Sequence, residues 1–409
     1  MTVKIAIVVP EKFFTTPELY GGGIIRAYNV YIEQLSKIPF IKLHFYRYNP
    51  VSKALYLASL VRNLVNIIKD GIDAIVSPCE VDLSMFLALV LGIVSRKPLA
   101  LVFNSVPLIG EVGCGLNSDE KEALKYIVNR RCYESKDGFV CIAKSLMKFL
   151  FICIILFLAR FLRKKIMAIA ITPHIGEELK KRGLNVANVY PGNGIDVIQH
   201  TIKTGKTGNK VYDACYCASP VHVEKGLIDV SYIWYLVVRK IPNAKLIIAG
   251  RIRDELSKNE IEKLIHKLGL SKNVLVQVSY EGLPREKVIE LLTCCKVLVY
   301  PSRKDVWPLV VGEALSVGTP VIAYALPNIE YAYSWHPAIK LVKIGDIIKF
   351  AEEVVKILQD VNTAATNALE EDEFTKKRLS WKKVALLELK ALIEVIKSPE
   401  RANMFHNMI

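Results

Sequence analysis

The sequence predicts an α/β protein built from two doubly wound, Rossmann-like domains that face each other across a cleft. Short runs of β-branched and apolar residues alternate with segments of helical length, and this pattern occurs twice along the chain. Because the runs are almost continuously apolar, they indicate parallel strands buried on both faces of a sheet. The length of 409 residues exceeds that of a usual single domain, which also favours two.

The two sets of strands are separated by a polar, glycine-containing stretch at residues 199–210. Such a composition is typical of a linker or of the entry to a second domain. We therefore expect an N-terminal domain over 1–198, a C-terminal domain over 199–375, and a helical segment over 376–409 that packs back on the first domain. The expected strands are 3–9, 41–48, 73–77, 99–103, 138–143 and 167–172, then 211–218, 244–250, 274–279, 296–302 and 320–324.

Composition narrows the classes of partner. Lys and Arg total 55 against 40 acids, a formal charge of +15. This excess favours an anionic lipid surface, a phosphorylated substrate or nucleic acid, although a merely solvated surface would also explain charges that are so spread out. No basic stretch is interleaved with aromatic residues, so nucleic acid is not the expected partner.

The nine cysteines contain no CxxC pair, and no His lies at metal-ligand spacing from them. We expect them to be buried thiols of a reducing compartment, and we expect no metal site. The first residues, "MTVKIAIVVPEKF", are expected to form a strand rather than a signal peptide. The predicted localisation is therefore cytoplasmic.

One segment, "SLMKFLFICIILFLARFLRKK" at residues 145–165, interrupts the alternation. Its uninterrupted apolar run is about half of the roughly 20 residues that span a bilayer, and it ends in a cationic cluster. A helix lying in a membrane interface fits best, with a buried core helix and a true span as alternatives. The expected membrane contacts are Phe149, Phe151, Phe157, Arg160, Arg163, Lys164 and Lys165.

Two turns could approach an anionic ligand. "YGGGIIRAYNVYIEQL" places Gly22 and Gly23 between the first strand and a helix, where backbone amides can come close to a ligand. It is not GxGxxG, so no dinucleotide fingerprint is present, and a turn without ligand remains an alternative. In "VEKG", Lys225 precedes a helix, so a phosphate could be held by its ammonium and by the helix dipole. A surface lysine at a helix start is the competing interpretation.

The stretch "RKDVWPLVVGEALSVGTPVIAY", residues 303–324, contains two separated acids. Asp305 is expected on the loop that leaves a buried strand, and Glu313 within a helix that Gly318 ends. The neighbours of Glu313 are apolar, and a carboxylate in such surroundings is costly unless it accepts hydrogen bonds. A pair of sugar hydroxyls would satisfy it, whereas a solvent-facing glutamate is the alternative.

This stretch resembles the signature of retaining glycosyltransferases of the GT-B fold, family 4, in which two acids are separated by seven residues and followed by Ala, Gly and Pro-Val. Asp305 and Glu313 have this spacing, although the family usually has glutamate at the first position. Further stretches that match in family order, so that the resemblance spans most of the chain, are "GGG", "IAITPHIGEELKKRGL", "NGID", "EKG", "AKLIIAG" and "RLSWKKVA".

The resemblance implies an enzyme of hexosyltransferase type that moves a sugar from a UDP- or GDP-sugar to an acceptor hydroxyl with retention, without metal or other cofactor. The C-terminal domain would bind the donor and the N-terminal domain the acceptor. Asp305 and Lys225 would be catalytic, Asp305 orienting the donor sugar and Lys225 neutralising the leaving diphosphate. Glu313 would hold the ribose. The other implied donor contacts are Trp307, Pro308, Leu309, Gly22, Gly23 and Arg303.

No side chain is a convincing nucleophile, so we expect front-face displacement in which the donor phosphate takes the proton of the acceptor. The basic, apolar segment at 145–165 suggests a lipid or lipid-linked saccharide as acceptor and a peripheral position on the cytoplasmic face of an anionic membrane. Two other functions stay open: a nucleotide-sugar epimerase of the same fold, and a degenerate homologue that binds a nucleotide sugar without turnover.

Two departures from the family pattern bear on the site. The arginine that commonly precedes "EKG" and binds the diphosphate is missing, and His222, Arg251 or Arg303 could replace it. Many members also have a histidine after the fourth strand, where this chain has Asn104. An Asn can hydrogen-bond a hydroxyl of the acceptor but cannot titrate as His does.

Overall fold

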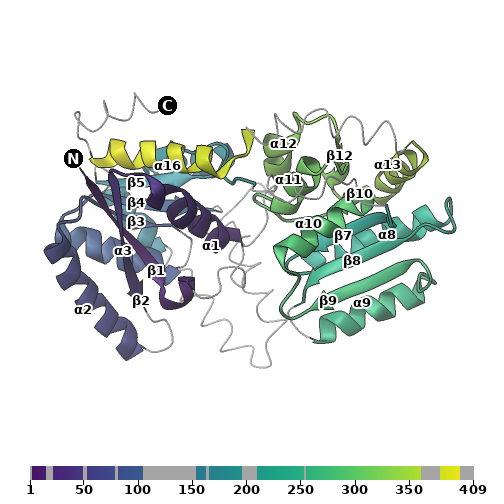
Figure 1. Ribbon diagram of the computed structural model, residues 1–409, viewed down its shortest axis with the longest axis horizontal. Helices are drawn as coiled ribbons and strands as arrows, with labels where there is room; N and C mark the ends of the chain where they lie inside the picture. Colours follow the sequence, from purple (N-terminus) through teal and green to yellow (C-terminus); the bar gives the residue numbers. More distant parts are fainter. Residues whose placement is uncertain are drawn as a thin grey trace. The chain divides into compact units, whose positions relative to one another are not determined.

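The computed structural model describes residues 2–14, 22–48, 53–78, 82–104, 153–162, 165–195, 210–252, 255–360 and 378–396. The chain divides into two compact units, hereafter unit 1 (Met1–Gly194 with Trp381–Ile409) and unit 2 (Ile195–Ser380). Each unit contains one sheet with its own covering helices (Figure 1). The predicted boundaries at 198 and 375 and the predicted strand at 138–143 lie outside the described residues.

Unit 1 is built on a six-stranded parallel sheet in the order β2-β1-β3-β4-β5-β6. Its central strands are buried along their whole length, which explains their continuously apolar sequences. The strands are β1 (Val3–Pro10), β2 (Ile41–Tyr48), β3 (Ala74–Ser77), β4 (Leu99–Phe103), β5 (Ile166–Ala170) and β6 (Val186–Asn188).

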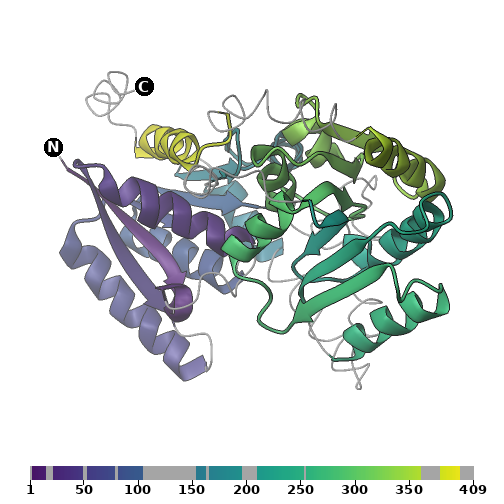
Figure 2. The ribbon, with the colours of Figure 1, turned by 45° about the vertical axis from the view of Figure 1, so that its right-hand side comes forward.

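The helices of unit 1 cover both faces of this sheet (Figures 1 and 2). The helix η3 packs against the C-terminal helix α16, and α2 packs against α3. The helical elements are η1 (Glu11–Phe14), α1 (Gly22–Ala27), η3 (Tyr28–Gln34), η4 (Leu35–Lys37), α2 (Lys53–Asp70), α3 (Asp82–Ser95), a helix at 153–161, α6 (Pro173–Lys181) and α16 (Trp381–Ile396).

A buried ion pair joins α1 to the C-terminal helix. The guanidinium of Arg26 donates from Nη2 to Oε2 of Glu388 at 2.6 Å and from Nε to the carbonyl of Gly192 at 2.7 Å. Both charged side chains are fully buried, and Tyr31 donates to the other oxygen of Glu388. Residues that are far apart in the sequence are thus held together across unit 1.

Unit 2 repeats the architecture with a second parallel sheet in the order β12-β11-β10-β7-β8-β9. Helices α8, α9 and α13 contribute the buried side chains that pack on one face of it. The elements are β7 (Tyr212–Ala218), η5 (Val223–Lys225), α8 (Leu227–Val238), β8 (Leu246–Arg251), α9 (Glu255–Lys267), β9 (Val274–Ser279), α10 (Arg285–Thr293), β10 (Cys295–Tyr300), α11 (Leu309–Ser316), β11 (Val321–Tyr324), α12 (Pro327–Tyr333), β12 (Ile339–Val342) and α13 (Ile347–Gln359).

The predicted fold class is confirmed: each unit is a doubly wound α/β domain with a wholly parallel sheet. The helix predicted after Asp305 is present as α11, and Gly318 follows its end with a φ of 73°. A glycine accepts this left-handed conformation without the steric cost of a Cβ. Two strands, β6 and β12, were not predicted.

Candidate functional site

Two loops of unit 2 meet where the strand order reverses. From β7 the chain proceeds through β8 and β9 on one side, whereas β10 lies on the other side of β7 and leads to β11 and β12. In open α/β sheets, ligands bind beyond the carboxyl ends of the strands at such a reversal. Lys225 lies on the loop that leaves β7, and Asp305 on the loop that leaves β10. The structure therefore brings the two predicted catalytic residues to one place.

Gly226 is the residue that allows these loops to touch. Its φ is 83°, and a Cβ built on it would lie 1.9 Å from the carbonyl oxygen of Pro301, so a larger residue is excluded. On either side of Lys225 the backbone is fixed by hydrogen bonds. The hydroxyl of Tyr216 donates to the carbonyl of Lys225 at 3.0 Å, and the amide of Arg303 donates to the carbonyl of Glu224 at 3.0 Å.

Lys225 and Asp305 form an ion pair. The Nζ of Lys225 lies 2.5 Å from Oδ2 of Asp305 and also donates to the carbonyl of Lys304 at 3.1 Å. The hydroxyl of Tyr300 donates to the same Oδ2 at 2.5 Å. Burial, and then the charge of Asp305, raise the pKa of Tyr300 well above its ordinary value, so the phenol remains a donor. Both side chains of the ion pair are partly exposed, which leaves them accessible to a ligand.

Glu313 lies within α11 and is buried, with 6% of its surface exposed. Its Oε1 lies 3.2 Å from Nε of Arg285, the first residue of α10. Burial raises the pKa of Glu313, and the positive charge of Arg285 opposes this rise. Burial removes water from the carboxylate, and the guanidinium of Arg285 offsets part of that cost. Hydrogen bonds from a polar ligand would offset it as well.

The segment between the two acids is held by packing. Trp307 is buried, and its ring meets that of Tyr333 edge-on with centroids 6.0 Å apart. The hydroxyl of Tyr333 donates to the carbonyl of Pro308 at 3.0 Å, and Leu309 begins α11. Pro308 has no N–H to offer a ligand. The direct donor contacts predicted for Trp307, Pro308 and Leu309 stay predictions.

The guanidinium of Arg303 is engaged with Asp229 on α8. Its Nε and Nη2 lie 2.8 and 3.1 Å from the two carboxylate oxygens, and Tyr324 donates to Asp229 at 2.8 Å. The hydrogen bond to Asp229 raises the pKa of Arg303, so the guanidinium stays a cation. The carbonyl of Arg251, at the end of β8, accepts from Val221. Which cation replaces the missing diphosphate arginine stays a prediction.

The third residue considered for that replacement, His222, caps η5 through its ring. Its Nδ1 accepts from the amide of Glu224 at 3.4 Å. This hydrogen bond fixes the imidazole at the start of the turn that contains Lys225.

Sequence reasoning missed Arg285, Tyr300 and Asp229. Arg285 and Glu313 lie on different helices, and Asp229 lies 74 residues before its partner Arg303. The spacing of residues in the sequence does not predict such contacts between separate elements. Tyr300 had one usable signal, because it ends a buried strand at the edge where ligands are expected.

In unit 1, Asn104 directly follows β4 at the carboxyl edge of the sheet. Both of its amide atoms, Oδ1 and Nδ2, are buried and make no hydrogen bond within the described part of the chain. Buried amides are normally satisfied, so Asn104 is an exception within the described ranges, and its contact with the acceptor stays a prediction. Gly22 and Gly23 form the start of α1.

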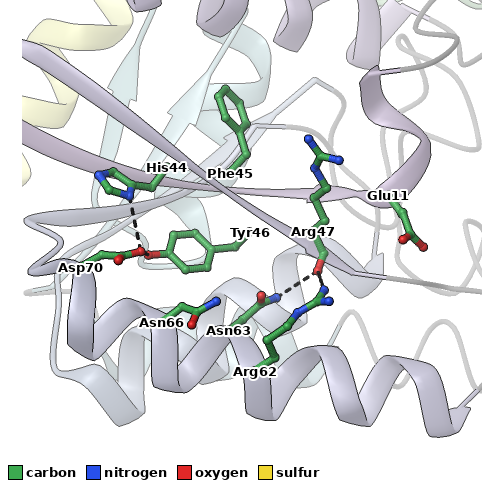
Figure 3. A pocket seen from close by; sticks show the side chains of 9 residues that line it. All are labelled: Glu11, His44, Phe45, Tyr46, Arg47, Arg62, Asn63, Asn66 and Asp70. Carbon is green, nitrogen blue, oxygen red and sulfur yellow. Dashed lines mark hydrogen bonds and ion pairs between the residues drawn. The ribbon is translucent and has the colours of Figure 1, made fainter.

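A cavity of about 340 Å³ lies in unit 1 beside β2 and α2 (Figure 3). Its polar groups mostly satisfy each other: Tyr46 donates to Asp70 at 2.7 Å, and Arg62 and Asn63 both donate to the carbonyl of Arg47 at 3.2 Å. We therefore assign no chemistry to it. It is lined by Glu11, His44, Phe45, Tyr46, Arg47, Arg62, Asn63, Asn66 and Asp70, none of which was a predicted site residue.

The described part of the predicted membrane segment is helical at 153–161. Phe157 is 67% exposed, and Arg160 and Lys165 are exposed as well. Four predicted contacts, Phe149, Phe151, Arg163 and Lys164, lie outside the described residues. Within the described ranges, no helix is both long enough and apolar enough to cross a bilayer.

Part of the chain is similar to a known protein family. Residues 214–370 match the family model described as glycosyl transferases group 1. The match lies in unit 2 and includes Lys225, Asp305 and Glu313. A search of curated protein sequences found no significant match.

Solved structures share the fold over nearly the whole chain. HepE from Anabaena, in complex with UDP, matches with a TM-score of 0.66 and 12% identity, over 96% of this chain and all of its own. Sucrose-phosphate synthase from Thermosynechococcus elongatus matches with 0.65 and 14%, over 96% and 99%. A glycosyltransferase from Rickettsia africae matches with 0.62 and 12%, over 97% and 99%. At such identities the likeness establishes the GT-B fold and not the reaction.

Proposed function

We propose that this protein transfers a sugar from a nucleotide-diphosphate sugar, UDP- or GDP-linked, to an acceptor hydroxyl with retention of configuration. The observation that carries the proposal is the contact of Lys225 with Asp305 at the strand reversal of the unit that matches glycosyl transferases group 1. HepE has also been solved with UDP-glucose, which supports a nucleotide sugar as the donor.

Lys225 stabilises the leaving group. An ammonium has three donors, and two of them are directed to Asp305 and to the carbonyl of Lys304. The remaining donor is available to an oxygen of the donor diphosphate, whose negative charge grows as the bond to the sugar breaks. A cation held in place before the reaction stabilises such charge without reorganisation.

Asp305 and Glu313 bind different parts of the donor. Asp305 accepts hydrogen bonds from the sugar hydroxyls, and the hydrogen bond from Tyr300 keeps its carboxylate oriented. Glu313 accepts from the ribose hydroxyls, which supply the hydrogen bonds that a buried carboxylate needs. The reaction follows a front-face displacement in which the donor phosphate takes the acceptor proton, and no metal ion participates.

The acceptor is a lipid or lipid-linked saccharide at the cytoplasmic face of a membrane. Asn104 contacts its hydroxyl, because the amide is buried and has no hydrogen-bond partner within the described ranges. The exposed apolar and basic side chains of helix 153–161 support a peripheral position on an anionic surface.

The test is a turnover assay with UDP-, GDP- and ADP-sugars, with and without membrane extract, in which nucleotide release and product configuration are followed by NMR. We expect one donor to be consumed and the anomeric configuration retained. Lys225→Ala should lower kcat by about 100-fold or more, as loss of one charge-stabilising donor typically does. The matched control Lys240→Ala, at an exposed residue just beyond the C-terminal end of α8, should be unchanged.

Other outcomes identify the alternatives. A changed nucleotide sugar without transfer would assign an epimerase. Binding of a nucleotide sugar without turnover of any donor, even with membrane extract, would assign a binding protein, which the missing diphosphate arginine favours. Equal activity of Lys225→Ala and Lys240→Ala would contradict the catalytic role of Lys225.

A further inference from the structure

In the described part of unit 1, large exposed apolar side chains occur on three helices. Among the described residues of this unit, the large exposed apolar side chains lie on α2, on α3 and on helix 153–161, and α1 and α16 contribute none. Single exposed apolar side chains are common, whereas a large group of them marks an interaction surface. The group comprises Val61, Val65, Ile68, Ile93, Val94, Ile154, Phe157 and Phe161.

These helices cover the same face of the sheet. Helix α2 connects β2 to β3, α3 connects β3 to β4, and helix 153–161 lies between β4 and β5. All three connections therefore run in the same direction across the sheet, and right-handed crossovers in one direction place their helices on one face. Helix α2 contacts α3, and both lie on the side of the sheet opposite α16 in two views (Figures 1 and 2). Helix 153–161 leads into β5. We call the surface formed by the eight side chains the three-helix face.

On α2, three apolar side chains face solvent although the helix also has a buried side. Val61, Val65 and Ile68 follow one another at spacings of four and three, so they form one stripe along the helix, and this stripe is exposed. The buried side of the helix carries Ser59, Asn63 and Ile67. Solvation alone does not favour an exposed apolar stripe, so the stripe indicates an interaction surface.

Helix 153–161 shows the same property with aromatic residues. Phe157 and Phe161, one helical turn apart, are 67% and 79% exposed, whereas Ile155 and Ala159 are buried. One side of the helix is therefore seated on unit 1 and the other presents two phenyl rings. Aromatic and apolar rows of this kind are typical of helices that lie in a membrane interface.

The charge of the three-helix face identifies the partner. Helices α2 and α3 contain one acid each, Asp70 at the end of α2 and Asp82 at the start of α3, and the sequence 153–161 contains none. The carboxylate of Asp70 accepts a hydrogen bond from Tyr46. Basic side chains interleaved with apolar ones attract an anionic lipid surface, whereas a protein partner would have to supply carboxylates. The exposed basic residues on or beside these helices are Arg62, Lys69, Arg96, Arg160 and Lys165.

We propose that the three-helix face binds an anionic lipid bilayer, with α2 and α3 contributing together with helix 153–161. The inference rests on the proposed function only for the identity of the acceptor, because lipid binding can be measured without turnover. It widens the membrane contact from the segment at 145–165 to a surface that brings three helices to the headgroup region. Unit 1, which carries Asn104, is then the unit held at the membrane.

The experiment is co-sedimentation of the full chain with phosphatidylcholine vesicles, with and without phosphatidylserine. We expect binding to the anionic vesicles, weaker binding at raised salt, and at least a tenfold loss of binding for Phe157→Ser with Phe161→Ser and for Val65→Ser with Ile68→Ser. Lys69→Gln with Arg160→Gln should reduce binding to anionic vesicles about tenfold or more.

The matched control is Ile348→Ser on α13 of unit 2, because Ile348 is 67% exposed and Ile68 is 69% exposed. Ile348→Ser should bind vesicles as the unchanged protein does. Nucleotide titration of each variant shows whether unit 2 is intact.

Wild-type protein that binds no anionic vesicle, or α2 variants that bind as tightly as the Ile348→Ser control, would overturn the inference. Self-association that Ile68→Ser abolishes would instead assign the face to a second copy of the chain. Vesicle binding without turnover would leave the inference standing while the proposed transfer fails, and turnover of a soluble acceptor without vesicle binding would do the reverse.

Discussion

Replacing Glu313 by Gln separates the chemistry of this residue from its packing. The side chain is 6% exposed and lies 3.2 Å from Arg285, so a change of size would disturb α11. Gln keeps the shape and one carbonyl acceptor but removes the charge. If Glu313 holds the ribose hydroxyls of the donor, the loss should appear in donor affinity.

The magnitude follows from the kind of hydrogen bond that is lost. A hydrogen bond to a charged acceptor contributes about 1.5–3 kcal/mol and a neutral one about 1 kcal/mol. For two hydroxyls the difference is about 2 kcal/mol, which corresponds to a roughly 30-fold higher Kd. Glu313→Ala, which removes both acceptors, should weaken binding by about 100-fold or more.

The pH dependence gives a second signature. Burial raises the pKa of Glu313, so donor affinity should fall as the pH is lowered through that raised value, and Glu313→Gln should lack this fall. Because the native carboxyl takes up its proton at a higher pH than the unfolded one, ionised Glu313 costs folding free energy above the native pKa. The stability of Glu313→Gln relative to the unchanged protein should therefore rise with pH across that interval.

The assay is isothermal titration with the nucleotide sugars, with Glu290→Gln as control, an exposed glutamate on α10 that pairs with Lys287. Arg285→Ala should shift the acidic fall in donor affinity to higher pH, because Arg285 opposes the rise in the pKa of Glu313, and Arg285→Lys should restore it in part. Equal donor affinities of Glu313→Gln and Glu290→Gln, over the whole pH range, would refute the ribose assignment.

Three further changes test the scaffold. Gly226→Ala should cost about 3 kcal/mol or more in stability and lower donor affinity, because φ is 83° and a Cβ would meet the carbonyl of Pro301. Unfolding in urea measures the loss of stability, and nucleotide titration measures the donor affinity. Unchanged stability and affinity would contradict the geometry. Glu388→Gln should lower the free energy of unfolding by about 3–5 kcal/mol, because Arg26 is left buried without its ion partner. The double variant Arg26→Met with Glu388→Leu should lose less stability. A double variant less stable than Glu388→Gln would contradict this account. Burial lowers the pKa of His336 to about 4, so the imidazole is protonated in the unfolded chain at a higher pH than in the folded protein. Stability should therefore fall by roughly 3 kcal/mol between neutral pH and pH ~4. In urea titrations at several pH values, His336→Asn should lose this part of the pH dependence, and a variant with the same pH dependence as the unchanged protein would exclude the assignment.

The sequence predicted the fold because its parallel strands are buried on both faces and therefore read as continuous apolar runs. The two strands that it did not reveal lie at sheet edges. In β6, Val186–Asn188, no residue is fully buried, and in β12, Ile339–Val342, only Val342 is. Short, partly exposed edge strands have no continuous apolar run, so composition could not find them.

Site residues could be predicted where the neighbouring sequence indicates their position. Their partners from other helices could not, because these depend on tertiary contacts. Lys225 before a helix and Asp305 after a buried strand were both expected at the carboxyl edge, and the structure brings them to 2.5 Å. The guanidinium on Glu313 comes from α10, and the partner of Arg303 comes from α8. Such partners are fixed by helix packing, about which the spacing of residues in the chain carries no information.

The central claim is that unit 2 binds the diphosphate at Lys225 and the ribose at Glu313. The most direct test is a crystal structure of the protein with the nucleotide sugar that binds most tightly. We predict a diphosphate oxygen within hydrogen-bond distance of Nζ of Lys225, and both ribose hydroxyls within that distance of the Glu313 carboxylate. A nucleotide bound without contact to either side chain would contradict the account.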